Sequence, residues 1–260
     1  MPDQLLHIAD TLTPLYGRQE AYAMARWIAE EPAGSYDAAE VLRRLQEHEP
    51  LQYVFGHTDW YGLRLCVTPD TLIPRPETAG IVDAVEVLCG AGVLPAHGPL
   101  TLADIGTGTG CIAIKIKHRH PAWDVQACDI SDAALSVARA NAADNGAAIT
   151  LFHCDILNHG LPRQYDVIVS NPPYICSSER SGMPANVLRY EPAAALFVPD
   201  DDPLLFYRRI ARLQEHAVLV FEINERFGAL TGDMLRAEGY TDITLTKDLC
   251  GKDRIITARR

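Results

Sequence analysis

The feature that most constrains the fold is the alternation of short apolar runs and amphipathic segments after Gly98. The runs predict seven strands, at Leu100–Ile105, Asp124–Cys128, Ile149–Phe152, Tyr165–Ser170, Ala217–Glu222, Ile243–Thr246 and Arg254–Thr257. The segments between them predict helices at Cys111–His118, Asp132–Ala143, Pro203–Leu213 and Arg226–Ala237. This order is typical of an α/β fold, an open and mostly parallel Rossmann-like sheet with helices on both faces.

The first 50 residues have a different, purely helical pattern. Apolar residues recur at helical spacing in three groups, around Leu5–Leu12, Ala21–Ile28 and Val41–Leu45. The polar run Ser35-Tyr-Asp37 marks the start of the third helix. We therefore expect a small helical domain over residues 1–50, which packs on a neighbour because three short helices hide little apolar surface.

Residues 51–75 are expected to form a β-hairpin that joins the two parts. Aromatic and apolar residues alternate here, and Gly56 and Gly62 interrupt them. Pro76 is suited to the first turn of the next helix, which opens a second domain over residues 76–260. The rigid turn at Arg75–Glu77 has two readings, as part of a lid over a substrate or as a brace between the domains.

The charge balance argues against a general nucleic-acid coat. The 260 residues include 34 acidic and 23 basic side chains, which gives a net charge of −11. A surface that follows a phosphate backbone needs an excess of positive charge. We expect no direct specificity for nucleic acid.

The seven cysteines and the apolar pattern favour a cytoplasmic protein. The cysteine number is odd and no Cys-x-x-Cys pair occurs, which indicates reduced thiols. The first residues do not resemble a signal peptide, and no apolar run reaches the roughly 18 residues that a membrane helix needs. No His-Glu-x-x-His motif or Cys/His cluster indicates a metal site.

The first candidate site is the glycine-rich turn Asp104-Ile-Gly-Thr-Gly-Thr-Gly110, between a predicted strand and a helix. Glycine allows a tight turn and a close approach of a ligand to the backbone. The spacing G-x-G-x-G differs from the dinucleotide fingerprint G-x-G-x-x-G. The carboxylate of Asp104 beside the turn suits a cationic ligand with an amino group, and S-adenosylmethionine carries both an ammonium and a sulfonium.

Two more carboxylates follow the next two strands. Asp129 ends the second strand and could hold two ribose hydroxyls, and Asp155 follows the third within reach of an adenine amine. Each acid alone would more often be a solvated loop residue or a helix cap. Three acids at the ends of three successive strands are expected to share one rim with the glycine turn.

The second candidate site is Ser170-Asn-Pro-Pro-Tyr174, at the end of the fourth strand. Two prolines remove amide donors and stiffen the chain. The Asn171 side chain and the Pro172 carbonyl are then free to accept hydrogen bonds from a planar nitrogen that bears two hydrogens. Such a substrate group could stack on Tyr174.

The two motifs together resemble the amino-methyltransferases that act on planar nitrogens. Further segments narrow the resemblance to the bacterial protein-(glutamine-N5) methyltransferases of peptide chain release factors. These segments are Pro50-Leu-Gln-Tyr-Val-Phe-Gly56, Thr71-Leu-Ile-Pro-Arg-Pro-Glu-Thr78, Tyr190-Glu-Pro192 with Ala195-Leu196, and Asp248-Leu-Cys-Gly-Lys-Asp-Arg254. The resemblance covers about residues 50–254, and the first 48 residues match only in their helical character.

This resemblance implies a class I S-adenosylmethionine-dependent fold and methylation of the glutamine in the Gly-Gly-Gln loop of class I release factors, with S-adenosylhomocysteine as product. The family's cofactor contacts correspond to Gly106, Thr107, Gly108, Thr109, Gly110, Asp129, Ile156 and Asn171. Its substrate amide would lie on Asn171, Pro172, Pro173 and Tyr174, with Asn171, Pro172 and Tyr174 as catalytic residues. The chain departs from the family where many members have Glu-His-Gly and it has Glu222-Ile-Asn-Glu225.

Two other readings stay open at this stage. An adenine-N6 methyltransferase of DNA or RNA would use the same chemistry but needs a basic groove and a base-flipping pocket. A cofactor-binding module without activity would explain the glycine turn but not the intact Asn-Pro-Pro-Tyr. We expect a monomer, because no long self-complementary apolar stripe is evident.

Overall fold

The computed structural model describes residues 2–32 and 34–260, and the chain forms two compact units. The first is a helical unit made by the chain up to Gly56 together with Pro184–Tyr190. The second is a sheet unit made by His57–Met183 and Glu191–Arg260. Each unit has its own apolar core.

The helical unit contains the three predicted helices and two short ones. Their bounds are α1 Pro2–Tyr16, α2 Arg18–Glu30, α3 Ala38–Gln46, α4 Leu51–Phe55 and α8 Ala185–Tyr190. Asp37 caps α3, since its side chain accepts a hydrogen bond from the Ala39 amide at 2.9 Å. The hydroxyl of Tyr190 donates to the Glu47 carbonyl at 2.9 Å, which ties the inserted segment to this unit.

The prediction of a hairpin starting at residue 51 is wrong at its beginning. Leu51–Phe55 is the helix α4, and the hairpin consists only of β1 His57–Trp60 and β2 Leu63–Cys66. Pro50 precedes the helix with φ −56°, and Gly56 ends it in the left-handed region with φ 74°. A proline before and a glycine after a helix favour these two conformations, and five residues are too few for the helical period to show.

The sheet unit is built on a seven-stranded sheet in which all seven predicted strands are present. They are β3 Thr101–Ile105, β4 Asp124–Asp129, β5 Thr150–His153, β6 Val167–Ser170, β9 Val218–Glu222, β10 Thr241–Lys247 and β11 Asp253–Arg259. The strand order is β10-β11-β9-β6-β3-β4-β5, with β11 antiparallel to both of its neighbours and the other pairs parallel. The Rossmann-like prediction is therefore confirmed.

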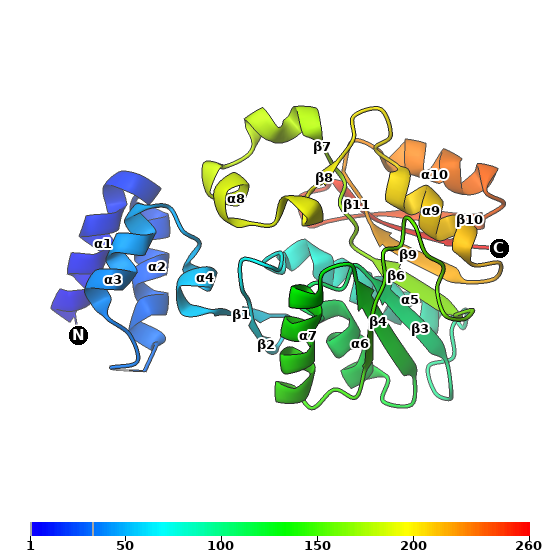
Figure 1. The fold of residues 1–260 in the computed structure, drawn as a ribbon, viewed down its shortest axis with the longest axis horizontal. Coiled ribbons are helices and arrows are strands. Elements are labelled where there is room, and N and C mark those ends of the chain that lie inside the picture. Colours follow the sequence, from blue (N-terminus) through cyan, green and yellow to red (C-terminus); the bar gives the residue numbers. More distant parts are fainter. Residues whose placement is uncertain (1, 33) are drawn as a thin grey trace. The chain divides into compact units, whose positions relative to one another are not determined.

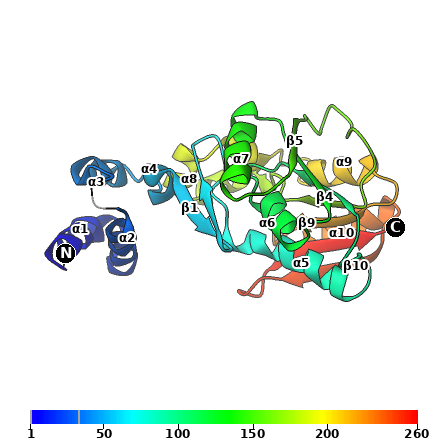
Figure 2. The same cartoon turned by 90° about the horizontal axis from the view of Figure 1, so that it is seen from below.

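Helices cover both faces of this sheet (Figures 1 and 2). One face packs against α5 Ala79–Gly90, α6 Cys111–Arg119 and α7 Asp132–Asp144, and the other against α9 Leu205–Leu213 and α10 Gly228–Ala237. Successive strand residues point to opposite faces, so fully buried Leu102 belongs to one core and Ala103 to the other. Pro76 opens a short 3-10 turn, η1 Pro76–Thr78, which leads into α5 as expected.

The chain reverses its direction across the sheet between β3 and β6. The segment β3-β4-β5 runs outward on one side, and β6 returns to pair with the other side of β3. In open α/β sheets, ligands bind at the carboxyl ends of the strands beside this switch point. Both predicted motifs follow these two strands.

Asn141 fastens the hairpin to the glycine-rich turn. Its side chain is fully buried on α7, and its Oδ1 accepts from the Cys66 amide at 2.6 Å. Its Nδ2 donates to the carbonyls of Cys66 at 3.0 Å and Thr109 at 2.9 Å. Asn141 thereby fixes the end of β2 at Cys66 relative to the glycine turn at Thr109.

We expect Asn141→Ala to lower the free energy of unfolding by about 3 kcal/mol, because it leaves buried backbone groups without partners. Urea denaturation followed by circular dichroism measures this difference. Arg139→Ala, on the exposed side of the same helix, is the matched control. Equal denaturation midpoints for the two variants would show that Asn141 has no such role.

The described residues contain no helix long and apolar enough to cross a membrane. Residues 2–32 and 34–260 likewise include no group of three or more His, Cys, Asp or Glu side chains arranged to hold a metal ion. All seven cysteines are free thiols.

Candidate active site

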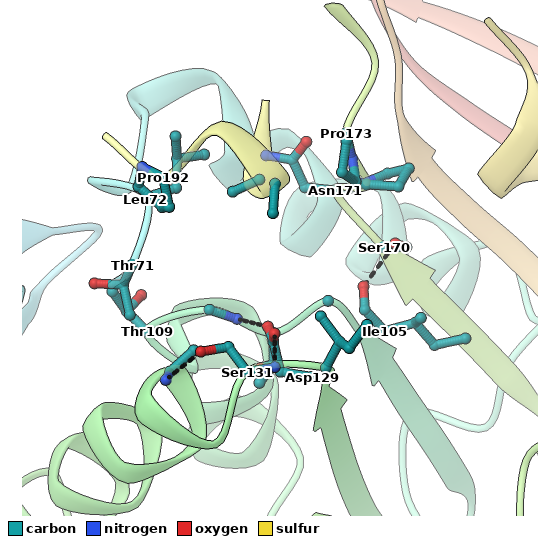
Figure 3. A pocket seen from close by; sticks show the side chains of 18 of the residues that line it. Thr71, Leu72, Ile105, Thr109, Asp129, Ser131, Ser170, Asn171, Pro173 and Pro192 are labelled. Carbon is teal, nitrogen blue, oxygen red and sulfur yellow. Dashed lines mark hydrogen bonds between the residues drawn. The ribbon is translucent and has the colours of Figure 1, made fainter. Parts of the chain in front are cut away.

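A cavity of about 390 Å³ lies at the carboxyl ends of β3, β4 and β6 in the sheet unit. Three groups of residues surround it: the glycine turn with the loops after β4 and β5, the Asn-Pro-Pro segment after β6, and the loops around Thr71–Arg75 and Pro192–Ala195. Figure 3 shows Asp129 and Ser131 on one side of this cavity, with Asn171 and Pro173 on the opposite side. The topology thus brings the two predicted motifs to one space.

The glycine turn curls over the end of β4. The amides of Gly106 and Thr107 donate to the Cys128 carbonyl at 2.9 and 3.0 Å. Gly106 and Gly108 have positive φ angles of 72° and 53°, and a Cβ on either would enter open space. A side chain there would be strained and would also fill the space that a ligand needs.

Gly110, unlike Gly106 and Gly108, does not line the cavity, so its glycine is needed for another reason. Its φ is 82°, and a Cβ on it would meet the Ala138 side chain of α7 at 3.3 Å. The third glycine therefore allows α6 and α7 to pack closely behind the turn.

Asp129 and Asp155 both line the cavity, and both hold the local backbone. Asp129 accepts from the Gly108 amide at 2.9 Å through Oδ2 and from the Ser131 amide at 3.0 Å through Oδ1. Asp155 accepts from the Leu157 amide at 3.0 Å and from Asn158 Nδ2 at 2.7 Å, and the Asn158 bond is the main cause of its lowered pKa. Thr107, Thr109 and Ile156 complete this side of the wall.

Asp104 does not line the cavity, although the sequence placed it beside the ligand. Its side chain is fully buried behind the turn, where Oδ2 accepts from the Thr107 hydroxyl at 2.6 Å. Burial raises the pKa of Asp104 to about 7, against the opposing effect of the Thr107 hydrogen bond. Asp104 therefore orients the turn from behind and has no direct contact with the cavity.

This burial predicts a pH-dependent effect of Asp104→Asn on stability. The unfolded carboxyl loses its proton near pH 3.8, whereas the folded one keeps it to about pH 7. Because the native state binds the extra proton between these values, the stability that Asp104 contributes falls as the pH rises through this window. We expect the melting temperature of Asp104→Asn, relative to the unmodified chain, to be higher at pH 8 than at pH 5. An equal difference in melting temperature between Asp104→Asn and the unmodified chain at both pH values would contradict the raised pKa of Asp104.

The Asn-Pro-Pro segment presents two free acceptors. Ser170 anchors its start by donating to the Ile105 carbonyl at 2.7 Å. Asn171 donates through Nδ2 to Thr78 Oγ1 at 3.2 Å. Within the described part of the chain, no donor reaches the Asn171 Oδ1 or the Pro172 carbonyl oxygen. Both oxygens can therefore accept from a group that enters the cavity.

Tyr174 lies behind this segment and is absent from the cavity wall. Its hydroxyl donates to Glu222 Oε1 at 3.0 Å, and burial raises its pKa well above the usual range. Its carbonyl accepts from Asn224 Nδ2 at 3.2 Å. The ring is partly buried and packs against the core under α9 and α10, so Tyr174 supports the segment from behind.

In the segment Glu222-Ile-Asn-Glu225, where the chain differs from many family members, the Asn224 side chain makes two hydrogen bonds. Besides the Tyr174 carbonyl, Asn224 Nδ2 donates to Glu179 Oε1 at 3.2 Å, and Glu179 accepts from the Cys176 amide at 3.0 Å. The Asn224 side chain thereby fixes the segment from Tyr174 to Glu179. Sequence reasoning missed Thr78 and Asn224, because no local spacing links them to the Asn-Pro-Pro-Tyr motif.

An ion pair joins the two loops on the far side of the cavity. Arg75 Nη2 lies 2.6 Å from Glu191 Oε1, whose side chain is only 1% exposed. The Arg75 carbonyl accepts from Trp60 Nε1 at 2.7 Å. Arg75 and Pro192 both line the cavity, so the turn at Arg75 braces the loop that borders it.

Residues 91–188 match the family model described as "Methyltransferase small domain". A release factor glutamine methyltransferase of Bacteroides thetaiotaomicron is 44% identical over 227 residues, which cover 85% of this chain and 79% of that protein. The chain belongs to the release factor glutamine methyltransferases. The family relationship extends over nearly the whole chain, since the Cereibacter sphaeroides member is 35% identical over 260 residues, 98% of this chain and 84% of that protein.

Among solved structures, the hMettl16 catalytic domain, in complex with an RNA hairpin, superposes with a TM-score of 0.58. It is 18% identical and covers 76% of each chain, so the likeness concerns the fold alone. It agrees with the class I methyltransferase fold of this chain.

Proposed function

We propose that this protein transfers the methyl group of S-adenosylmethionine to the side-chain amide nitrogen of the glutamine in the Gly-Gly-Gln loop of class I release factors. The observation that carries this is the pair of free acceptors, Asn171 Oδ1 and the Pro172 carbonyl, on two residues that line the same cavity as the glycine turn. A primary amide offers two N–H donors in one plane, which matches two such oxygens. A relative that is similar over 85% of this chain is named a release factor glutamine methyltransferase.

The residues on the glycine-turn side fit the cofactor. Gly106 and Gly108 leave open space above the backbone, and Asp129 lines the wall with a carboxylate that can accept from two ribose hydroxyls. Ile130, which is 56% exposed, and buried Ile156 supply apolar surface for the adenine. The acidic side chains of this wall suit a ligand with an ammonium and a sulfonium. When bound, the cofactor supplies an electrophilic methyl group.

Asn171 and Pro172 position the substrate amide by accepting hydrogen bonds from its two N–H groups. An amide nitrogen is a poor nucleophile because its lone pair is delocalised into the carbonyl. Acceptors at Asn171 and Pro172 stabilise the nitrogen as it becomes pyramidal, which is a stronger interaction in the transition state than in the ground state. The described cavity wall includes no His or Lys, and none is needed, because the nitrogen becomes acidic after methylation and then releases its proton to solvent.

The helical unit is proposed to recognise the release factor at a distance from its glutamine. This part holds five helices among the described residues and lines no part of the cavity. The proposal includes a monomeric enzyme that acts in the cytoplasm, where class I release factors work. Light scattering of the purified protein with and without a release factor tests the monomer.

A methyl-transfer assay with labelled S-adenosylmethionine tests the function directly. The substrates are a purified class I release factor, the same factor with the loop glutamine replaced by alanine, and duplex DNA. We expect label on the loop glutamine, located by tandem mass spectrometry, and none on the variant or the DNA. Label on DNA would favour adenine methylation, and the absence of label with cofactor still bound would exclude both activities.

A further inference from the structure

The helix α9 carries three arginines, and the middle one differs from the other two in its partners. Arg208 and Arg212 each form an ion pair with an acidic side chain. Arg209 forms none within the described part of the chain and donates to backbone carbonyls instead. Its Nε donates to the Ile156 carbonyl at 2.9 Å, and its Nη2 donates to the His159 carbonyl at 2.9 Å. The role of this arginine is therefore to be sought in the backbone that it holds.

The two carbonyls belong to a short turn that borders the cavity. The turn spans residues 155–159 after β5, and Asp155, Ile156 and Leu157 line the cavity. The His159 amide donates to the Asp155 carbonyl at 2.8 Å, which closes the turn. These residues lie in neither a helix nor a strand, so no regular ladder of hydrogen bonds fixes them. The position of three cavity residues depends on the few bonds that hold this turn.

The bond from Arg209 to the Ile156 carbonyl fixes one peptide group of the turn from its second side. The peptide bond between Ile156 and Leu157 is planar, with that carbonyl on one side and the Leu157 amide on the other. The amide donates to Asp155 Oδ1 at 3.0 Å, while the carbonyl accepts from Arg209. This plane cannot rotate without breaking one of the two bonds. Through it, Arg209 also restrains the Asp155 carboxylate.

The turn carries an acceptor and a free donor on two neighbouring residues that line the cavity. Asp155 accepts one hydrogen bond through each carboxylate oxygen, which leaves capacity on both, because a carboxylate has about four acceptor sites. The Ile156 amide has no acceptor within residues 2–32 and 34–260. Adenine has an amine donor next to a ring-nitrogen acceptor on its Watson–Crick edge, which matches this pair.

We propose that Arg209 is a positioning residue that holds the turn 155–159 so that Asp155 and Ile156 bind the adenine of the cofactor. The inference rests on the placement of the cofactor in the proposed function. Phe206 and Ile210, on the same helix, line the cavity, whereas Arg209 does not. Arg209 therefore acts on the adenine only through the turn, and the ribose separates the adenine from the methyl group that is transferred.

The test measures, by calorimetry, the Kd for S-adenosylhomocysteine and for S-inosylhomocysteine. In inosine an oxygen replaces the amine and the neighbouring ring nitrogen carries a hydrogen, so donor and acceptor exchange places. We expect the unmodified enzyme to bind the inosyl compound about 10-fold more weakly, the value of one hydrogen bond to a charged acceptor. In Arg209→Ala, the Kd for S-adenosylhomocysteine should rise about 10-fold and that for the inosyl compound less than about twofold, so that the discrimination is lost.

Two further variants complete the comparison. Arg208→Ala removes the same charge from the neighbouring position of α9, where Arg208 pairs with Asp202 and does not contact the turn. It should leave the ratio of the two Kd values unchanged. Arg209→Lys keeps the positive charge but replaces the two-donor fork by a single ammonium, so we expect a ratio between those of Arg209→Ala and the unmodified enzyme.

The ratio of the two Kd values separates positioning from general stability. An unchanged ratio in Arg209→Ala would overturn the inference, because a purely structural role weakens both ligands alike. So would an equal loss of discrimination in Arg208→Ala, or equal binding of both compounds by the unmodified enzyme. If Arg209→Ala does not fold, Arg209→Lys must lower the ratio. Failure of the unmodified enzyme to methylate the release factor, with its discrimination intact, would instead reject the proposed substrate.

Discussion

Asn171→Ala is expected to lower kcat for release factor methylation by about 10²–10³-fold, the range for removing one preorganised hydrogen-bonding group from an active site. The variant loses the acceptor that no donor within the described chain satisfies, while the Pro172 carbonyl remains. Substrate binding through distant surfaces should persist, so KM for the release factor should change much less than kcat. Single-turnover transfer of labelled methyl measures the chemical step, and calorimetry measures the Kd for S-adenosylmethionine.

Asn171→Asp serves as the comparison for this result. Aspartate keeps an oxygen that can accept from the substrate amide, so we expect a smaller loss of kcat than in Asn171→Ala. A variant with alanine that turns over normally would remove Asn171 from the catalytic step. If instead the cofactor Kd rose as much as kcat fell, Asn171 would be a cofactor-binding residue only.

Asp129→Ala is expected to raise the Kd for S-adenosylmethionine about 100-fold, with most of kcat retained at saturating cofactor. Hydrogen bonds to a charged acceptor contribute about 1.5–3 kcal/mol each, and the ribose offers two hydroxyls to this carboxylate. The substitution also releases the Gly108 amide from its 2.9 Å hydrogen bond, which loosens the glycine turn. Isothermal titration calorimetry gives the Kd, and steady-state assays at high cofactor concentration give kcat.

Asp132→Ala is the matched control for Asp129→Ala. Asp132 is an exposed acid in the first turn of α7, three residues from Asp129, and its loss changes the local charge equally. An equal rise of the Kd in both variants would assign the effect to the general negative field around the cavity. A normal Kd in Asp129→Ala would show that the carboxylate only braces the turn.

Features encoded by consecutive residues could be predicted from the sequence. The sheet was predictable because each strand is a short apolar run, and the glycine turn because Gly106 and Gly108 directly follow one. The topology then brings Asp129, Asp155 and Asn171 to one cavity, since parallel strands end at the same edge of the sheet. No distant contact had to be known for these predictions.

Other features depend on contacts between distant residues. The hydrogen bond from Asn171 to Thr78 spans 93 residues, and the bond from Tyr174 to Glu222 spans 48. The direction in which a side chain points is equally hidden, as Asp104 shows: it lies next to the turn in sequence but is fully buried behind it. The sequence also could not separate Leu51–Phe55 from the hairpin, because one helical turn between Pro50 and Gly56 has no visible period.

The chain crosses between the two units three times, after Gly56, Met183 and Tyr190. At the last crossing, one peptide bond separates Tyr190, which is bonded to Glu47 of the helical unit, from Glu191, which holds Arg75 beside the cavity. The backbone therefore passes from a hydrogen bond within the helical unit to the loop that borders the cavity across a single peptide bond, so an insertion between Tyr190 and Glu191 would disturb both attachments.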